Sequence, residues 1–507
     1  YIQCVVDAAR TGLDIHSLRC GEHHSQLYMG LLALTQVAFP GQLSAIVAMN
    51  LALAAGALAA FAVVLRRLVP GDEFRVERAL VVLVLAVHPL VAATLLQVNS
   101  DFGAYVFLAM VLAALAWRRY WFCALAGTLL CFSKETGALA YGAAVGLHVL
   151  FVAVERPGRW GARFTGAIRS AAPAFVPLVL YAGFIAWWAA TQPSYAIWNR
   201  DMQERPLTGL HWFDFDDVVF RSYAAIIFVL GFAWIPTAVI VTDVAIGAAR
   251  TVRRMGDRAL PGMDVRFAGY LVSLTAVLVY LLTVYRTWSF PRYFAMLAPL
   301  LVLAALVSLV RLKVGARARR IALGAFALVL LSANRVSWDP VSRALFGTLS
   351  LGPTRVYDVS GIAHDFRVMD ADNLCYNLQF TGFHWALNAM YAGLRPTATT
   401  TIVFPRFNRW GLWGPLEART FARVIPRPGT VTPDFADETM IAGRRERKPR
   451  ELWLVEQPND GDTLAVQALH RYYADSDSTR YTAGGLTLTA RHLVRRDVPV
   501  LASGGHR

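Results

Sequence analysis

Apolar runs alternate with short polar loops over most of the first two thirds of the chain. They lie near residues 43–65, 79–98, 102–117, 120–133, 137–154, 171–190, 219–248, 267–285, 293–310 and 321–333. A helix needs about 20 apolar residues to cross the roughly 30 Å of hydrocarbon in a bilayer, and these runs approach or exceed that length. The pattern therefore predicts a polytopic α-helical membrane bundle of about ten spans over residues 43–334.

The loops between these runs differ in charge. One set of alternate loops carries 20 Arg and Lys residues, against eight in the other set. Because basic loops stay on the cytoplasmic side, we expect the basic set to face the cytoplasm and the other set to face outward. Residues 1–42 are then external, and their apolar spacing predicts two helices on the membrane surface, near 1–20 and 27–39.

The last part of the chain, residues 335–507, has lower hydropathy and is rich in Trp, Tyr, Pro and Arg. Residues 452–456 are expected to form a buried strand, 463–473 a helix and 485–494 an alternating strand. The sequence therefore predicts a C-terminal soluble α/β domain on the external (periplasmic) side.

The composition agrees with a membrane protein and excludes other classes. Of 507 residues, 56% are hydrophobic, and the net charge of +15 is spread over short clusters between the spans. A nucleic-acid-binding domain gathers such charge on one face, so no nucleic-acid partner is expected. The five cysteines show no C-x-x-C spacing and thus no sign of a zinc site. The first residue is Tyr rather than Met, so a further span is expected before Tyr1.

An adjacent cation and anion, Lys134 and Glu135, interrupt an apolar stretch. Lys134 is one of only three lysines among 49 basic residues. Ionisable groups at membrane depth cost at least about 2.5–3.5 kcal/mol each, so they persist where they pair, face a wet cavity or bind a charged ligand. The favoured interpretation is a functional site. The alternative is a mutually satisfied pair that ends two short helices at the membrane surface.

Four short segments lie, in order, on the expected external side. They are Gly21-Glu-His-His-Ser-Gln-Leu-Tyr28, Asn99-Ser-Asp101, Phe132-Ser-Lys-Glu-Thr-Gly137 and Phe290-Pro-Arg-Tyr293. Their order and spacing resemble those of the large membrane glycosyltransferases of the GT-C fold, close to the group containing the protein O-mannosyltransferases and the lipid A aminoarabinose transferases. The prolines usual in the family's first segment are absent here.

The resemblance implies an enzyme embedded in the bacterial cytoplasmic membrane. Such an enzyme moves a sugar from a polyprenyl-phosphate donor to a hydroxyl of a glycan, lipid or protein acceptor on the external face, by an inverting single displacement. The resemblance implies no particular cofactor, and it leaves open whether a divalent metal takes part. The family's general base lies at the outer end of the first span, which by this alignment falls before Tyr1.

The same resemblance implies roles for individual residues. Lys134 and Arg292, with Tyr293, would bind the donor phosphate, and Asp101 would orient the acceptor or support the base. Glu135 would hold Lys134 or contact the sugar. Further substrate contacts are expected from Glu22, His24, Trp198 and Trp212.

Each of these residues also has a simpler interpretation. Asp101 directly precedes an apolar run and could be a helix N-cap. Arg292 could be an interfacial residue that snorkels beside Tyr293. His24 could be a solvated loop residue rather than a ligand, and aromatic residues such as Trp198 are common at membrane boundaries.

Two other classes of function stay open. A transporter or flippase could use the same buried charges as a substrate or proton relay, although the sequence shows no repeat of matched broken helices. The second open class is a non-catalytic protein that takes part in polysaccharide assembly.

Overall fold

The computed structural model of the chain describes residues 5, 8–13, 27–40, 43–96, 98–191, 228–251, 262–284, 291–334, 340–346, 386, 389–390, 392–394, 401–405, 432–436, 450–456, 469–483 and 486–496. Apart from its first two residues, the chain forms two compact units, Gln3–Asn377 and Leu378–Arg507. The finer division into 1–42, 43–334 and 335–507 stays a prediction.

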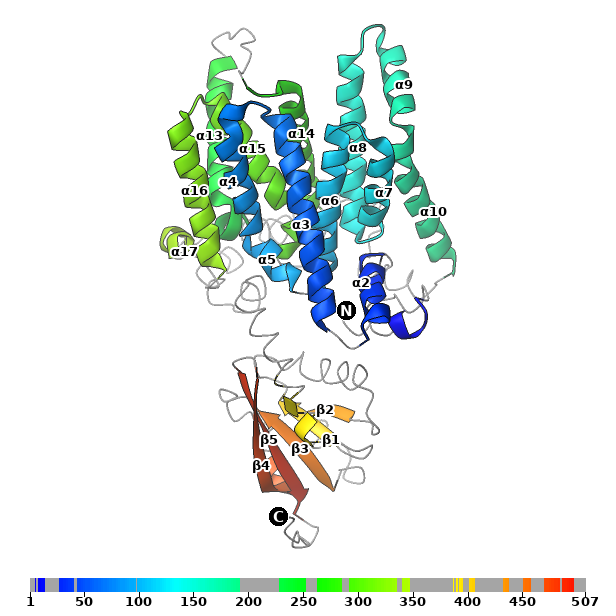
Figure 1. The fold of residues 1–507 in the computed structure, drawn as a ribbon, viewed down its shortest axis with the longest axis vertical. Helices are drawn as coiled ribbons and strands as arrows, with labels where there is room; N and C mark the ends of the chain where they lie inside the picture. Colours follow the sequence, from blue (N-terminus) through cyan, green and yellow to red (C-terminus); the bar gives the residue numbers. More distant parts are fainter. Residues whose placement is uncertain are drawn as a thin grey trace. The chain divides into compact units, whose positions relative to one another are not determined.

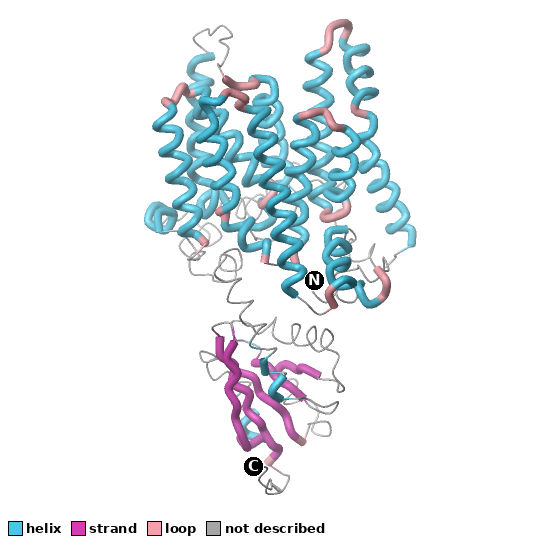
Figure 2. Tube along the Cα trace, viewed as in Figure 1, coloured by secondary structure: helices cyan, strands magenta, loops and turns pink. Residues whose placement is uncertain are grey.

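The first unit is a bundle of helices (Figure 1), coloured cyan in Figure 2. Its α-helices are α2 (Leu27–Ala38), α3 (Leu43–Leu68), α4 (Arg75–Ala86), α5 (Pro89–Leu95), α6 (Ser100–Ala116), α7 (Tyr120–Cys131), α8 (Glu135–Glu155), α9 (Trp160–Ser170), α10 (Val176–Thr191), α13 (Trp234–Thr251), α14 (Val265–Val284), α15 (Leu297–Arg311), α16 (Ala316–Ala333) and α17 (Pro340–Phe346). Short helical turns precede several of them: η1 (Asp72–Phe74), η2 (Ala172–Phe175), η3 (Val229–Ala233) and η4 (Pro291–Phe294).

Four helices among the described residues are long and apolar enough to cross a membrane: Ser44–Leu68, Glu135–Glu155, Val229–Gly247 and Val265–Leu282. Two bent pairs also qualify if each counts as one span, namely Asp72–Ala86 with Pro89–Leu95, bent by 51°, and Trp160–Ser170 with Ala172–Trp188, bent by 74°. The chain is therefore a multi-pass membrane protein. The prediction of about ten spans is not confirmed, because helices in other apolar runs are shorter.

Two helices form the core of the bundle. α6 and α15 are buried along nearly their whole length and are apolar on all faces. α3 and α7 pack against α6, and α13 and α14 pack against α15. These outer helices expose large apolar side chains, including Leu51, Leu125 and Val244. A helix that is hydrophobic all round suits a buried position, and the exposed apolar side chains outside it suit contact with lipid.

The predicted helix near 27–39 is present as α2, and it is fixed to the bundle by the buried Tyr28. The Tyr28 hydroxyl donates to Asn50 Oδ1 at 2.7 Å, and Asn50 Nδ2 donates to the Leu95 carbonyl at 2.8 Å. The Tyr28 ring covers Gly103 so closely that a Cβ there would lie 2.6 Å from it. This contact holds α2 against the first turns of α6.

One end of the bundle, which we call the basic end, holds the C-terminus of α3, the α6–α7 turn and the α15–α16 turn (Figure 1). Ion pairs link its helices: Arg67 with Asp264 at 2.8 Å, Arg118 with Glu155, and Arg319 with Glu77 at 3.2 Å. The orientation of this end toward the cytoplasm stays a prediction.

The second unit contains a five-stranded mixed sheet. Its strands are β1 (Thr401–Pro405), β2 (Thr432–Ala436), β3 (Glu451–Glu456), β4 (Tyr473–Ala483) and β5 (Leu486–Arg495), in the spatial order β2-β1-β3-β5-β4. β1 runs parallel to β2 and β3, whereas β5 is antiparallel to β3 and β4. The two predicted strands are confirmed as β3 and β5. The described end of the predicted helix, residues 469–472, is helical, but β4 already begins at Tyr473.

Candidate functional site

Three charged side chains from distant parts of the sequence meet at the start of α6, at the end of the bundle opposite the basic end. The Asp101 carboxylate accepts a hydrogen bond from Lys134 Nζ, and its Oδ2 lies 3.9 Å from Arg292 Nε. The side chains of Asp101, Lys134 and Arg292 are only 6%, 10% and 22% exposed. One carboxylate therefore faces two cations in a largely buried setting.

Asp101 is held by the local structure of the helix start. It is the second residue of α6, and its backbone N–H donates to Asn99 Oδ1 at 2.9 Å. Asn99 is thus the N-cap, and the alternative interpretation of Asp101 as the cap is wrong. Because the Asn99 side chain caps the helix, the Asp101 carboxylate can bind the cations instead. An acidic residue in the first turn also suits the positive end of the helix dipole.

Lys134 lies at the break between α7 and α8. Its backbone is extended, with φ −163° and ψ 150°, and its carbonyl accepts from Gly137 N–H at 2.9 Å as α8 begins. A Cβ on Gly137 would lie 2.4 Å from the Leu130 carbonyl, so the close return of the chain requires glycine there. This turn brings the start of α8 beside the end of α7 and places Lys134 next to α6.

The third segment of the site is η4, which carries Arg292 and Tyr293. Lys134 Nζ lies 4.1 Å from the centroid of the Tyr293 ring, and Arg292 Cζ lies 5.9 Å from it. A cation near an aromatic face gains electrostatic attraction when water is excluded. An arginine that snorkels extends its head into water. Arg292 is mostly buried and has Asp101 within ion-pair distance, so its geometry does not favour that interpretation.

Two further groups at the start of α8 were not singled out by the sequence. The Thr136 hydroxyl is buried and has no hydrogen-bond partner among the described residues. The N–H groups of the first helical turn also carry partial positive charge. The position of Thr136, directly after the Lys134-Glu135 pair, was the available signal. The two cations and the N-terminus of α8, which Lys134 directly precedes, could accommodate an anion.

Of the remaining predicted site residues, the structure describes only Glu135. Glu135 is the first residue of α8 and is half-buried. Glu22, His24, Trp198 and Trp212 lie outside the described residues, and their roles stay predictions. Among the described residues no group of three or more His, Cys, Asp or Glu side chains could hold a metal ion.

Comparison with known proteins gives little more. No family model matches the chain. No curated protein matches it either. Among solved structures, the chain is similar to the crystal structure of ArnT from Cupriavidus metallidurans bound to undecaprenyl phosphate, with a TM-score of 0.47 and 13% sequence identity. The match covers 100% of this chain and 94% of that one. At this level of similarity we transfer no residue roles from it.

Proposed function

We propose that the chain is a membrane glycosyltransferase that moves a sugar from a polyprenyl-phosphate donor to an acceptor hydroxyl. The observation that carries the proposal is the pair of largely buried cations, Lys134 and Arg292, which both lie within ion-pair distance of Asp101. A buried cation needs a counter-charge. A lipid-linked phosphate carries negative charge and would supply these two cations with a further counter-charge.

The reaction would break the bond between the anomeric carbon and the phosphate oxygen and form a bond to the acceptor oxygen. Negative charge then grows on the departing polyprenyl phosphate, and the acceptor hydroxyl loses its proton to a base. Lys134 and Arg292 stabilise the growing charge, since charge-assisted hydrogen bonds in a site shielded from water are strong. Asp101 orients the acceptor or supports the base, and attack from the opposite face inverts the anomeric carbon.

Asp101 would also serve as the resting counter-ion of the site. Its carboxylate lies within ion-pair distance of both cations. An incoming phosphate would compete with Asp101 for Lys134 and Arg292, and this exchange frees the carboxylate for the acceptor. Tyr293 would keep the Lys134 ammonium in position while its partner changes.

The other assignments complete the proposed site. Glu135 would contact the sugar or Lys134, and Glu22, His24, Trp198 and Trp212 would line the substrate pocket. Aromatic rings can stack on sugar rings, and carboxylates can accept from sugar hydroxyls.

The basic end would face the cytoplasm, so that the site and the C-terminal unit face outward from a bacterial cytoplasmic membrane. The donor would reach the site from the bilayer, and the acceptor is a glycan, a lipid or a protein. A divalent metal stays open.

Binding of the purified chain to undecaprenyl phosphate, compared with undecaprenol, tests the phosphate site directly. We expect the phosphate to add affinity in the unaltered chain, and Lys134→Ala or Arg292→Ala to remove on the order of tenfold or more of it. Lys313→Ala removes an exposed lysine at the basic end and should leave binding unchanged. Equal binding of the two lipids would exclude the proposed phosphate site.

Turnover with a panel of polyprenyl-phosphate sugars tests the reaction. Lys134→Ala should lower transfer by about 10²-fold, and Lys134→Arg should rescue it only in part, because guanidinium differs from ammonium in shape and reach. Phosphate-dependent binding together with lipid translocation and no sugar transfer would instead favour the flippase.

A further inference from the structure

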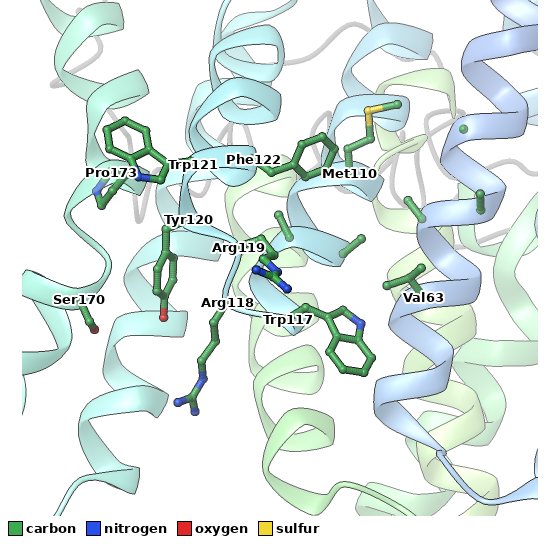
Figure 3. Close-up of a pocket in the computed structure, with 15 residues that line it drawn as sticks. Val63, Met110, Trp117, Arg118, Arg119, Tyr120, Trp121, Phe122, Ser170 and Pro173 are labelled. Carbon is green, nitrogen blue, oxygen red and sulfur yellow. The ribbon is translucent and has the colours of Figure 1, made fainter.

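A hollow of about 1010 Å³ lies where α3, α6 and α7 meet, close to the basic end (Figure 3). One wall is built from small side chains of α3 and α6: Gly56, Ala59, Ala60, Val63, Ala113 and Ala114. Such a wall is smooth and apolar. A hydrocarbon chain can pack along such a wall, and the wall offers no hydrogen-bonding side chain to a polar ligand.

Exposed aromatic side chains line the hollow at and just after the α6–α7 turn. Trp117, Trp121 and Phe122 line it, and all three are exposed, Trp121 to 77%. Large aromatic side chains that are exposed in a membrane protein are typical of the level where lipid headgroups meet the hydrocarbon. The part of the hollow at the α6–α7 turn therefore lies where a lipid would place its glycerol and phosphate.

The charged groups of the lining are both positive. Among the described residues that line the hollow, Arg118 and Arg119 are the charged ones, and none is acidic. Arg118 is paired with Glu155. The Arg119 guanidinium, in contrast, makes no hydrogen bond or ion pair within the described part of the chain, and it is exposed.

The turn between α6 and α7 explains why the two arginines behave differently. Arg118 has a left-handed backbone with φ 55°, and Arg119 N–H donates to the Ala114 carbonyl at 2.8 Å, which closes the end of α6. Figure 3 shows Arg118 extending away from the wall that contains Val63, and Arg119 on the side toward it. One cation is thus used to join two helices, and the other is available at the hollow.

We propose that this hollow binds an acidic glycerophospholipid of the bilayer. An acyl chain would lie along the small residues of α3 and α6, and the phosphate would bind Arg119 between the exposed tryptophans. Basic pockets between membrane helices bind acidic headgroups in this way. The lipid supplies the negative charge that the lining lacks, and its chain fills the apolar part of the volume.

This site is separate from the proposed phosphate site around Asp101. Asp101 and Trp117 lie 16 residues apart on and just after α6, which corresponds to about 24 Å at 1.5 Å per residue. The inference therefore does not rest on the proposed glycosyltransferase function. Small residues can also seat a neighbouring transmembrane helix. A helix of apolar residues would leave Arg119 without a counter-charge, so the lipid is the better match.

Native mass spectrometry of the purified chain, stripped of lipid and titrated with one lipid at a time, tests the proposal. The probes are dioleoylphosphatidylglycerol and dioleoylphosphatidylcholine, which share their acyl chains and differ in net charge. We expect retention of the phosphatidylglycerol to exceed that of the phosphatidylcholine by about fivefold, the effect of one basic residue near a charged surface. Arg119→Gln should abolish this preference, and Arg119→Lys should keep most of it.

Two further variants separate the hollow from general surface charge. Arg317→Gln removes another exposed arginine of the basic end and should leave the preference intact. Ala113→Leu reduces the hollow and should weaken retention of both lipids. Equal retention of the two lipids, or a preference that survives Arg119→Gln, would overturn the proposal. So would a dimer that Ala113→Leu abolishes, or displacement of bound phosphatidylglycerol by equimolar undecaprenyl phosphate.

Discussion

Among the described residues, the bundle contains two clusters of one buried carboxylate and two cations, one at each end, and they are built differently. At the basic end, Glu77 on α4 binds Arg319 at 3.2 Å and Arg320 at 3.4 Å, and both arginines come from the same helix, α16. At the other end, Asp101 binds Lys134 and Arg292, which come from the α7–α8 break and from η4. At the basic end the ion pairs therefore join two continuous helices, α4 and α16. Around Asp101 they join the start of α6, the α7–α8 turn and η4.

The partners of the cations also differ. Arg319 packs over the Phe74 ring at 4.9 Å and donates to the Val314 carbonyl at 2.7 Å, and Arg320 donates to the Glu73 carbonyl at 3.4 Å. Backbone carbonyls thus accept a hydrogen bond from each arginine of this cluster. No backbone acceptor is described for Lys134, whose contacts are a carboxylate and the face of a ring. The first cluster suits permanent structure, and the second suits exchange of one anion for another.

The largest expected effect is on stability and comes from Glu77→Ala. Glu77 is fully buried, and its loss leaves Arg319 in a largely buried position without its counter-charge. Removing one partner of a buried ion pair costs about 3–5 kcal/mol, so thermal unfolding of the purified protein should shift strongly to lower temperature. The nearby exposed Glu73, changed to Ala, is the matched control. If Glu77→Ala lost undecaprenyl phosphate binding without losing stability, the Glu77 cluster would not be the structural one of the two.

Asp101→Asn should have the opposite character. The amide no longer neutralises Lys134 and Arg292, so undecaprenyl phosphate should bind more tightly, by about tenfold or about 1.4 kcal/mol. Sugar transfer should nevertheless fall, because the acceptor loses its carboxylate. Binding and turnover, measured on the same preparation, check both parts. Weaker phosphate binding by Asp101→Asn would show that Asp101 supports the anion site rather than competing with the ligand.

The sequence predicted where the helices lie better than how they meet. Apolar runs were sufficient for α3, α8 and α14, since each must bury a long stretch in lipid or in the bundle. The pairing of Asp101 with Lys134 could not be predicted. α6 is apolar on all faces, so its periodicity does not say which neighbour it meets.

The sheet shows the same limit. β3 is a short apolar run and β5 alternates between apolar and polar residues, and both were predicted. β4, Tyr473–Ala483, has polar residues on both faces and exposes most of them, as an edge strand can, so hydropathy gives it no signal. The 51° bend at Pro89 had a signal in the proline itself, which cannot continue a helix without losing a hydrogen bond.

A smaller effect is expected where α2 is held beside the Asp101 cluster. A methyl group on Gly103 would overlap the Tyr28 ring, so Gly103→Ala should destabilise the protein by about 1–3 kcal/mol. Gly146→Ala is the matched control, because nothing lies within 4 Å of its added Cβ and alanine favours a helix. Thermal unfolding should therefore move in opposite directions for the two variants. A shift in the same direction for both would mean that the Tyr28 contact does not fix α2.

The smallest expected effect distinguishes strain from charge at the basic end. Lys313 and Arg118 both end a helix in the left-handed backbone region, with φ 57° and 55°. A non-glycine residue there costs roughly 1–2 kcal/mol, so Lys313→Gly should raise the unfolding temperature slightly. Arg118→Gly gains the same relief but loses the ion pair with Glu155, which is worth up to about 1 kcal/mol at a partly exposed position. Its net change should therefore be smaller than that of Lys313→Gly, and an equal gain for both variants would show that the Arg118 ion pair adds nothing to the stability of the basic end.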